Sequence, residues 1–265
     1  MARARTPLRW LALVLAGVIA AAGCPGGRPA RGALVLSDDF DGTALGPTWG
    51  TCHWWGPDGC TILTNDELEW YQPGQVTVGE GVLRLTAEPG SVVAHGRHFP
   101  YVSGMVSSGR AGDRRQDRPR FALTYGRVEV RFRIPRGTGT WPALWMLPVS
   151  NEELPEIDLL EVRGQAPDLP SMTLHPERGP RQRREVRTAD LSRGWHTIAL
   201  DWAPGLLVWT LDGVERFRVT GAAVPSEPMH LVANLAVGGD AGTPTAATRF
   251  PATFLVDRVR VWERA

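Results

Sequence analysis

The stretch Gly126-Arg-Val-Glu-Val-Arg-Phe-Arg-Ile134 decides the fold class, because apolar and charged residues alternate along it without a break. In a β-strand successive side chains point to opposite faces, so this pattern predicts a strand with one buried and one solvated face. Such one-sided burial is typical of antiparallel sheets. We therefore expect a half-buried antiparallel strand at Gly126–Ile134.

The same alternation, bounded by Gly, Pro and Asp, recurs from residue 33 onward, and we find no convincing stretch with the helical period of 3.6. Asp212-Gly213 between two such runs is the signal of a two-residue hairpin turn. Many short strands without helical crossovers predict one all-β domain over residues 33–265, built as a sandwich of two antiparallel sheets. Further strands are expected at 82–87, 197–202, 206–211, 215–219, 230–237 and 254–262.

Composition narrows the class of protein. The 265 residues are 43% hydrophobic and 22% charged, which is ordinary for a soluble globular protein and argues against global disorder and against a multi-span membrane protein. The 29 basic and 28 acidic residues leave a net charge of +1, so we expect no nucleic-acid partner. Arginines gather locally in residues 107–120 and 176–190, which are expected to be solvated loops, with a border of a ligand cleft as the alternative.

Residues 1–23 have the layout of a secretory signal peptide, because arginines precede an apolar stretch that is short for a membrane span. Ala21-Ala-Gly-Cys24 resembles a bacterial lipoprotein processing site, which would attach lipid to Cys24 and hold the protein at a membrane; ordinary cleavage nearby is the alternative. Residues 24–32, rich in Pro and Gly, predict a flexible tether. We therefore expect an exported monomer, either extracellular or a cell-envelope lipoprotein.

The three cysteines fit this picture. If Cys24 carries lipid, Cys52 and Cys60 remain as a pair in an oxidising compartment, and we predict a disulfide between them. Two thiols eight residues apart, with only His53 adjacent, lack the usual spacing of metal ligands.

The segment Glu156-Ile-Asp-Leu-Leu-Glu161 places three acids inside an apolar run. On a regular strand Glu156 and Asp158 share a face, whereas Glu161 points to the opposite side. A β-bulge at Leu159-Leu160 would absorb the extra residue and return Glu161 to the acidic face. The spacing therefore predicts a bulged strand with three aligned acids.

Aligned in this way, the long side chains of Glu156 and Glu161 could bring their carboxyl groups to the separation of about 5 to 5.5 Å that retaining glycosidases use. The shorter Asp158 is better suited to sharing a proton with a neighbour. The alternative is a solvated acidic face paired with the arginines at 127, 131 and 133. Three like charges in register destabilise a sheet unless they have a use, so we favour the catalytic interpretation.

The segment resembles the active-site signature of family 16 glycoside hydrolases, in the form with one extra residue found in laminarinase-like endo-β-1,3-glucanases. The resemblance implies a concanavalin-like β-jelly-roll with a sugar cleft across its concave sheet. It also implies an exported retaining endo-glycosidase that hydrolyses β-1,3- or mixed β-1,3/1,4-glucans such as laminarin by double displacement, with no cofactor for catalysis. The likeness extends over residues 125–131, 139–148, 234–239, 250–252 and 256–261.

Three alternatives remain open within the same fold. The substrate could be a galactan, and the acceptor could be a second sugar in place of water. A non-catalytic β-glucan-binding protein would keep the tryptophans and lose the acids.

Residue roles also follow from the resemblance. It implies Glu156 as the nucleophile, Glu161 as the general acid/base and Asp158 as the residue that assists Glu156. Trp145 could equally belong to the core and His175 to an exposed loop. Position 69 departs from the family motif, with Glu in place of Gln. The residues implied as substrate-binding are Asn65, Glu67, Trp141, Trp145, His175 and Asn234.

Two further expectations concern the edges of the molecule. Members of the family often carry a structural calcium ion, for which Asp39, the Gly81 carbonyl and Asp257 supply suitable oxygen donors. Trp54 and Trp55 are expected either to wall one end of the cleft or to pack against the disulfide.

Overall fold

The computed structural model describes residues 31–53, 60–110, 118–150 and 153–265. Cys24, the predicted signal peptide, and Trp54 and Trp55 lie outside these ranges. The first strand, β1 (Arg31–Asp38), begins two residues before the expected domain boundary. Arg31 and Gly32 were expected in the tether, but they belong to the folded domain because β1 pairs with the last strand of the chain, Arg31 opposite Arg264.

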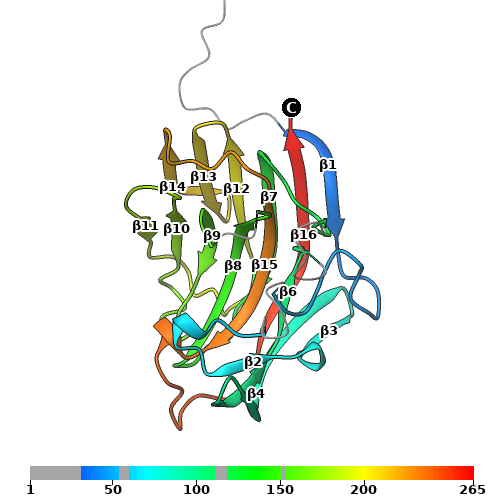
Figure 1. Cartoon of the computed structure of the whole chain (residues 1–265), viewed down its shortest axis with the longest axis vertical. Helices are drawn as coiled ribbons and strands as arrows, with labels where there is room; N and C mark the ends of the chain where they lie inside the picture. Colours follow the sequence, from blue (N-terminus) through cyan, green and yellow to red (C-terminus); the bar gives the residue numbers. More distant parts are fainter. Residues whose placement is uncertain (1–30, 54–59, 111–117, 151–152) are drawn as a thin grey trace, which may run out of the picture.

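The strands form two sheets, and Figure 1 shows β1 running alongside β16 in the larger one. In spatial order the ten-stranded sheet contains β14 (Val214–Thr220), β13 (Leu206–Leu211), β12 (His196–Ala203), β7 (Gly126–Arg133), β16 (Ala252–Arg264), β4 (Val82–Ala94), β5 (Arg97–Ser103) and β2 (Glu69–Tyr71), with β1 on β16 and β3 (Val76–Gly79) on β4. The six-stranded sheet contains β11 (Gln182–Glu185), β10 (Ser171–His175), β9 (Glu156–Glu161), β8 (Thr140–Pro148), β15 (Met229–Val237) and β6 (Met105–Ser107).

The pairing is antiparallel, as predicted, except that β2 runs parallel to β5. Among the described residues, three short 3-10 helices connect strands: η2 (Leu63–Asn65), η3 (Pro73–Gln75) and η4 (Gly239–Ala241). Within the described ranges, no helix has the length and apolar character needed to cross a membrane.

The β7 strand confirms the alternation from which the fold was predicted. Val128, Val130 and Phe132 are at most 4% exposed and belong to the core. At the predicted hairpin, Asp212 and Gly213 both have positive φ angles, 51° and 78°. Two residues with positive φ are what a type I′ turn requires between two twisted strands, here β13 and β14.

One core contact ties the two sheets together at the acidic segment. Trp209 of β13 is fully buried, and its Nε1–H donates to the main-chain oxygen of Asp158 in β9 over 2.9 Å. Burial of a large side chain of this kind contributes about 1.5–3 kcal/mol. The larger sheet thereby fixes the backbone of the strand that carries the acids.

One expectation about loops was wrong. The arginine-rich run 176–190 contains a strand, β11, which pairs with β10 through Thr173 opposite Arg183. An edge strand tolerates charged residues because water reaches its exposed side, so the arginines concealed its strand character. In the other run, Arg110 and Pro119 form an isolated bridge, and residues 111–117 lie outside the described ranges.

Candidate active site

The predicted bulge is present in β9. Leu144 and Trp145 are consecutive in β8, yet they lie opposite Leu160 and Asp158, so Leu159 is the extra residue. Ile157, Leu159 and Leu160 are at most 1% exposed and anchor the strand in the core. The bulge brings the outer glutamates to the same face as Asp158, where all three acids line one cleft.

This cleft has a volume of about 630 Å³ and lies over the smaller sheet. It brings together residues from strands β8, β9, β10 and β15 and from the segment that contains η2. Every residue predicted to be catalytic or substrate-binding lines it: Asn65, Glu67, Trp141, Trp145, Glu156, Asp158, Glu161, His175 and Asn234.

The environment of the two glutamates, Glu156 and Glu161, favours their protonated forms. Burial, together with the nearby Asp158 charge, raises the pKa of Glu161 to about 8, although Arg183 opposes part of this increase. Burial and Asp158 likewise raise the pKa of Glu156 well above its usual range. The cleft can therefore hold protons on carboxyl groups at neutral pH, which a general acid requires.

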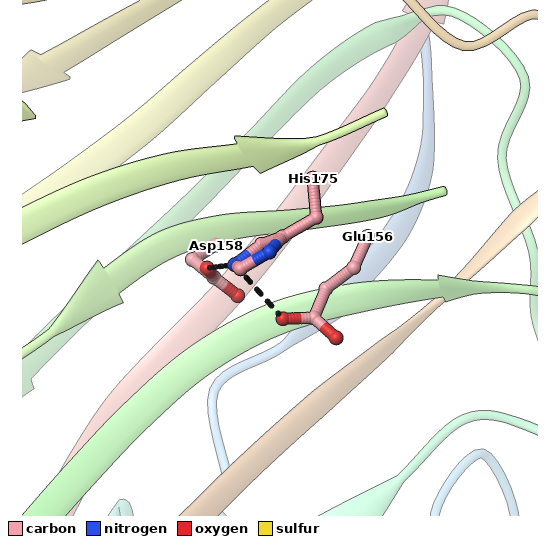
Figure 2. A group of neighbouring side chains, drawn as sticks. All are labelled: Glu156, Asp158 and His175. Carbon is pink, nitrogen blue, oxygen red and sulfur yellow. Dashed lines mark hydrogen bonds and ion pairs between the residues drawn. The ribbon is translucent and has the colours of Figure 1, made fainter. Parts of the chain in front are cut away.

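A histidine joins two of these acids (Figure 2). His175 ends β10 opposite Glu156, and its Nε2 lies 3.2 Å from Oδ2 of Asp158 and 3.5 Å from Oε1 of Glu156. An N–H at this position donates toward both carboxyl groups. The alternative of an exposed loop histidine is wrong, because His175 belongs to the sheet and faces the acids.

The same three side chains are the one group of metal-binding type in the described ranges. Their donor atoms lie within 4.8 Å of one another, so they could hold a divalent cation. The acids that such an ion would occupy are those assigned to the reaction.

The alternative in which arginines neutralise the acidic row is wrong. Arg127 pairs with Asp201 over 2.7 Å and with Glu129 over 3.1 Å. Arg131 pairs with Asp257. Arg133 lies over the ring of Trp195. These arginines contact residues of the larger sheet, so they do not neutralise the acids of β9.

The two tryptophans of β8 differ in exposure. Trp141 is half-buried and lines the cleft, and its ring packs on Gly239, where a Cβ would come within 2.6 Å of it. Trp145 is 8% exposed, and its Nε1–H donates to Oδ1 of Asn234 over 2.8 Å. Trp141 therefore offers a face to a flat ligand, while Trp145 is largely part of the structure beneath the cleft.

Asn65 and Glu67 also have different environments. Asn65 is exposed, so its side chain can meet a ligand. Glu67 is 2% exposed, and its carboxyl group accepts hydrogen bonds from Asn65 Nδ2 and from the main-chain N–H of Ile62, both over 3.2 Å. Glu67 thus organises the segment that presents Asn65.

The disulfide between Cys52 and Cys60 is present, as predicted. Both cysteines pack against a small cluster that includes Tyr71 and Trp145. The covalent link therefore supports the region behind the cleft.

The residues expected to hold calcium make other contacts in this structure. A Cβ on Gly81 would lie 3.8 Å from the main-chain oxygen of Asp39, so these two positions are neighbours. The carboxylates of Asp39 and Asp257, however, form ion pairs with Arg260 and Arg131. Each ion pair occupies one carboxylate oxygen, and no step of the reaction is assigned to calcium.

Sequence reasoning missed several residues that line the cleft. Arg181 and Arg183 come from the run that hides β11, and their position fits the alternative that this run borders a ligand cleft. Ala143, Leu147 and Ala236 also line the cleft, from strands β8 and β15. The other missed residues come from connecting segments: Thr61, Ile62, Leu63, Thr64, Glu153, Leu154 and Asp240.

Two antiparallel sheets and a cleft with two glutamates flanking an aspartate define the class of protein, a glycoside hydrolase of the β-jelly-roll type. The family model described as glycosyl hydrolases family 16 matches residues 69–252, and the chain belongs to this family.

Relatives extend the match over most of the chain. The endo-1,3-1,4-β-glycanase EglC of Rhizobium meliloti is 34% identical over 249 residues, which is 86% of this chain and 51% of the relative, so this chain spans about half of that protein. A β-glucanase of Rhodothermus marinus is 31% identical over 86% of this chain and 84% of its own length. The laminarinase catalytic domain of Thermotoga maritima superposes with a TM-score of 0.78 at 25% identity, covering 89% of this chain and all of that domain.

Proposed function

We propose that this chain is an exported retaining endo-β-glucanase that hydrolyses β-1,3- or mixed β-1,3/1,4-linked glucans such as laminarin. The observation that carries the proposal is the bulged strand β9, which places Glu156 and Glu161 in one cleft on either side of Asp158. The names of the relatives, a β-glycanase and a β-glucanase, support a β-glucan as the substrate.

In the first half of the reaction Glu156 attacks the anomeric carbon as a carboxylate, and the glycosidic C–O bond breaks. Glu161 gives its proton to the departing oxygen, and the raised pKa keeps that proton available at neutral pH. The product is a covalent glycosyl–enzyme ester on Glu156. In the second half Glu161, now a carboxylate, takes a proton from water, which attacks the same carbon and releases Glu156.

Asp158 and His175 control the charge of the nucleophile. The neighbouring Asp158, together with burial, raises the pKa of Glu156, so the two carboxyl groups do not titrate independently. When Glu156 gives up its proton, the carboxylate is free to attack. His175 Nε2 lies 3.5 Å from Glu156 Oε1 and 3.2 Å from Asp158 Oδ2, so an N–H at this position stabilises negative charge on either carboxyl group.

Export is part of the proposal. The residues before β1 have the layout of a signal peptide, and the disulfide between Cys52 and Cys60 suits an oxidising compartment. We propose that Cys24 carries lipid and that the catalytic domain works as a monomer at the cell envelope. Intact-mass measurement of the protein purified from membranes, with a Cys24→Ser variant as control, tests the lipid; equal masses after allowing for the substitution would contradict it.

The function is tested with laminarin, lichenan and agarose, by measuring reducing ends and following the first anomer released by proton NMR. We expect oligosaccharides from the two glucans, with the β-anomer appearing first. An α-anomer as first product would contradict the retaining mechanism. Cleavage of agarose alone would show that the substrate is a galactan. Binding of a glucan without cleavage would show that the protein is a glucan-binding protein and not a hydrolase.

A further inference from the structure

Two carboxyl groups lie buried side by side at the border of the cleft. Glu67 and Glu69 are 2% and 0% exposed, and Glu69 begins β2. Glu67 accepts its hydrogen bonds from Ile62 and Asn65, and Glu69 Oε2 accepts one from the main-chain N–H of Val237 over 2.7 Å. The other oxygen of Glu69, Oε1, is buried and receives no hydrogen bond from a donor.

The surroundings bring little positive charge to this pair. On β5, packed alongside β2, Tyr101 lies opposite Glu69, and the Arg97 guanidinium donates to the main-chain oxygen of Glu67 over 2.8 Å. The ring of His53 lies 6.4 Å from the ring of Tyr71, and His230 lies near His53. Burial, together with the nearby His230, lowers the pKa of His53 to about 3, which leaves the His53 ring neutral at pH 7.

Two ionised carboxylates in contact and away from water repel each other strongly, so one of them keeps a proton. We propose that Glu69 is a protonated carboxylic acid that donates from Oε1 to Glu67. This shared proton positions the floor of the cleft, by which we mean Tyr71, Asn234 and Trp145. The placement explains why Oε1 of Glu69 has no donor, since it is itself the donor. Burial and the neighbouring Glu67 raise the pKa of Glu69 well above its usual range, in agreement with this placement.

A chain of hydrogen bonds links the pair to the catalytic strands. The Tyr71 hydroxyl contacts Glu69 and accepts from Asn234 Nδ2 over 2.9 Å. Asn234 Oδ1 accepts from Trp145 Nε1, and Trp145 lies opposite Asp158 in the sheet. Glu69 is thus a positioning residue, which acts on the cleft through Tyr71, Asn234 and Trp145.

The proton is tested directly by infrared difference spectroscopy at pH 7 between the wild type and Glu69→Gln. We expect the substitution to remove a protonated-carboxyl C=O band and leave the carboxylate bands in place. Loss of carboxylate bands in their place would show that Glu69 is ionised and overturn the proposal. The complementary variant Glu67→Gln is expected to lose carboxylate bands, so the pair remains testable if one variant folds poorly.

Thermal unfolding as a function of pH gives a second, independent readout. Because the folded pKa of Glu69 is raised, the wild type loses stability as the pH rises above about 4.5 toward that folded pKa. Glu69→Gln has no such proton to lose, so its Tm advantage over the wild type is expected to grow with pH. A Tm difference that stays constant with pH would overturn the proposal.

Glu88→Gln is the matched control for both experiments. Glu88 is a half-buried glutamate of β4 that accepts a hydrogen bond from Gln75, and its substitution is expected to follow the wild type across the pH range.

Near-UV circular dichroism then tests the link to the floor of the cleft. We expect an alkaline change in the tryptophan signal of the wild type that is absent in Glu69→Gln and smaller in Trp145→Phe; an equal change in all three would refute the link. None of these readouts depends on glucan hydrolysis, so their failure leaves the proposed function standing.

Discussion

The two sheets treat the same residue types in opposite ways. In the larger sheet Glu129 and Asp201 share Arg127, and all three side chains are at most 17% exposed. In the smaller sheet Glu156, Asp158 and Glu161 face a cleft, and the cation near them, Arg183, also pairs with Glu185. A guanidinium between acids compensates their negative charge, whereas burial beside Asp158 raises the pKa of Glu156 and of Glu161.

The difference shows that the carboxyl groups of the larger sheet and those proposed to be catalytic differ in charge pairing more than in sequence composition. Both sheets contain acids in alternating strands, and both place them next to arginine-rich segments. The register decides which arginine meets which acid. Four experiments can break or sharpen this comparison, ordered by the size of the effect.

The largest effect is expected from the acids of the cleft. Glu161→Gln removes the proton donor and should lower kcat/KM on laminarin by about 10²–10⁴-fold. Glu156→Gln removes the nucleophile and should lower it by about 10⁴-fold or more. Glu129→Gln in the larger sheet is the control and should retain activity, measured as reducing ends. Equal losses in all three variants would erase the distinction between the sheets.

Next in size is the loss of the cation from the larger sheet. Arg127→Met leaves Asp201 and Glu129 without this guanidinium in a buried site, which should reduce the free energy of unfolding by about 3–5 kcal/mol. Urea unfolding measures the loss, and kcat of the folded fraction should remain that of the wild type. If stability is unchanged, the larger sheet does not rely on charge pairing.

The third experiment concerns a buried histidine that lies near an arginine. His230 is 1% exposed, and burial, with Arg110 nearby, lowers its pKa to about 4. Because the unfolded chain binds this proton near pH 6.5 and the folded chain only near pH 4, stability falls as the pH drops through that window, by roughly 3 kcal/mol.

His230→Phe should remove this part of the acid sensitivity, as measured by urea unfolding at pH 7 and pH 4. His98→Gln, an exposed histidine of β5, serves as the control and should behave as the wild type does. An unchanged pH dependence in His230→Phe would show that another group causes the acid loss.

The smallest effect concerns the pH profile of kcat/KM, in particular the pH at which activity falls on the alkaline side. The limb of kcat/KM should fall near pH 8, where Glu161 loses its proton. Asp158→Asn removes the charge that helps raise this pKa, so the limb should move to lower pH by about one unit. A limb that stays in place would assign the raised pKa to burial alone.

Much of the fold and the site could be predicted from local sequence. Alternation predicts β7 within one residue, and the odd spacing of the three acids predicts the bulge, because aligned acids require an extra residue. Strand β11 could not be predicted, since an exposed edge strand needs no apolar face. The Glu67–Glu69 pair and its bonds to Tyr71 and Asn234 depend on contacts across 163 positions of sequence, and no local pattern carries that information.

The position of β16 has a consequence for how the protein forms. This strand of 13 residues pairs with β7 on one side and with β4 and β1 on the other, and it is the last strand along the chain. The middle of the larger sheet therefore stays open during synthesis until its final segment has emerged. Such sequence-distant pairing slows folding, and the incomplete sheet exposes unpaired edges meanwhile. The larger sheet is therefore completed only when β16 pairs with its neighbours.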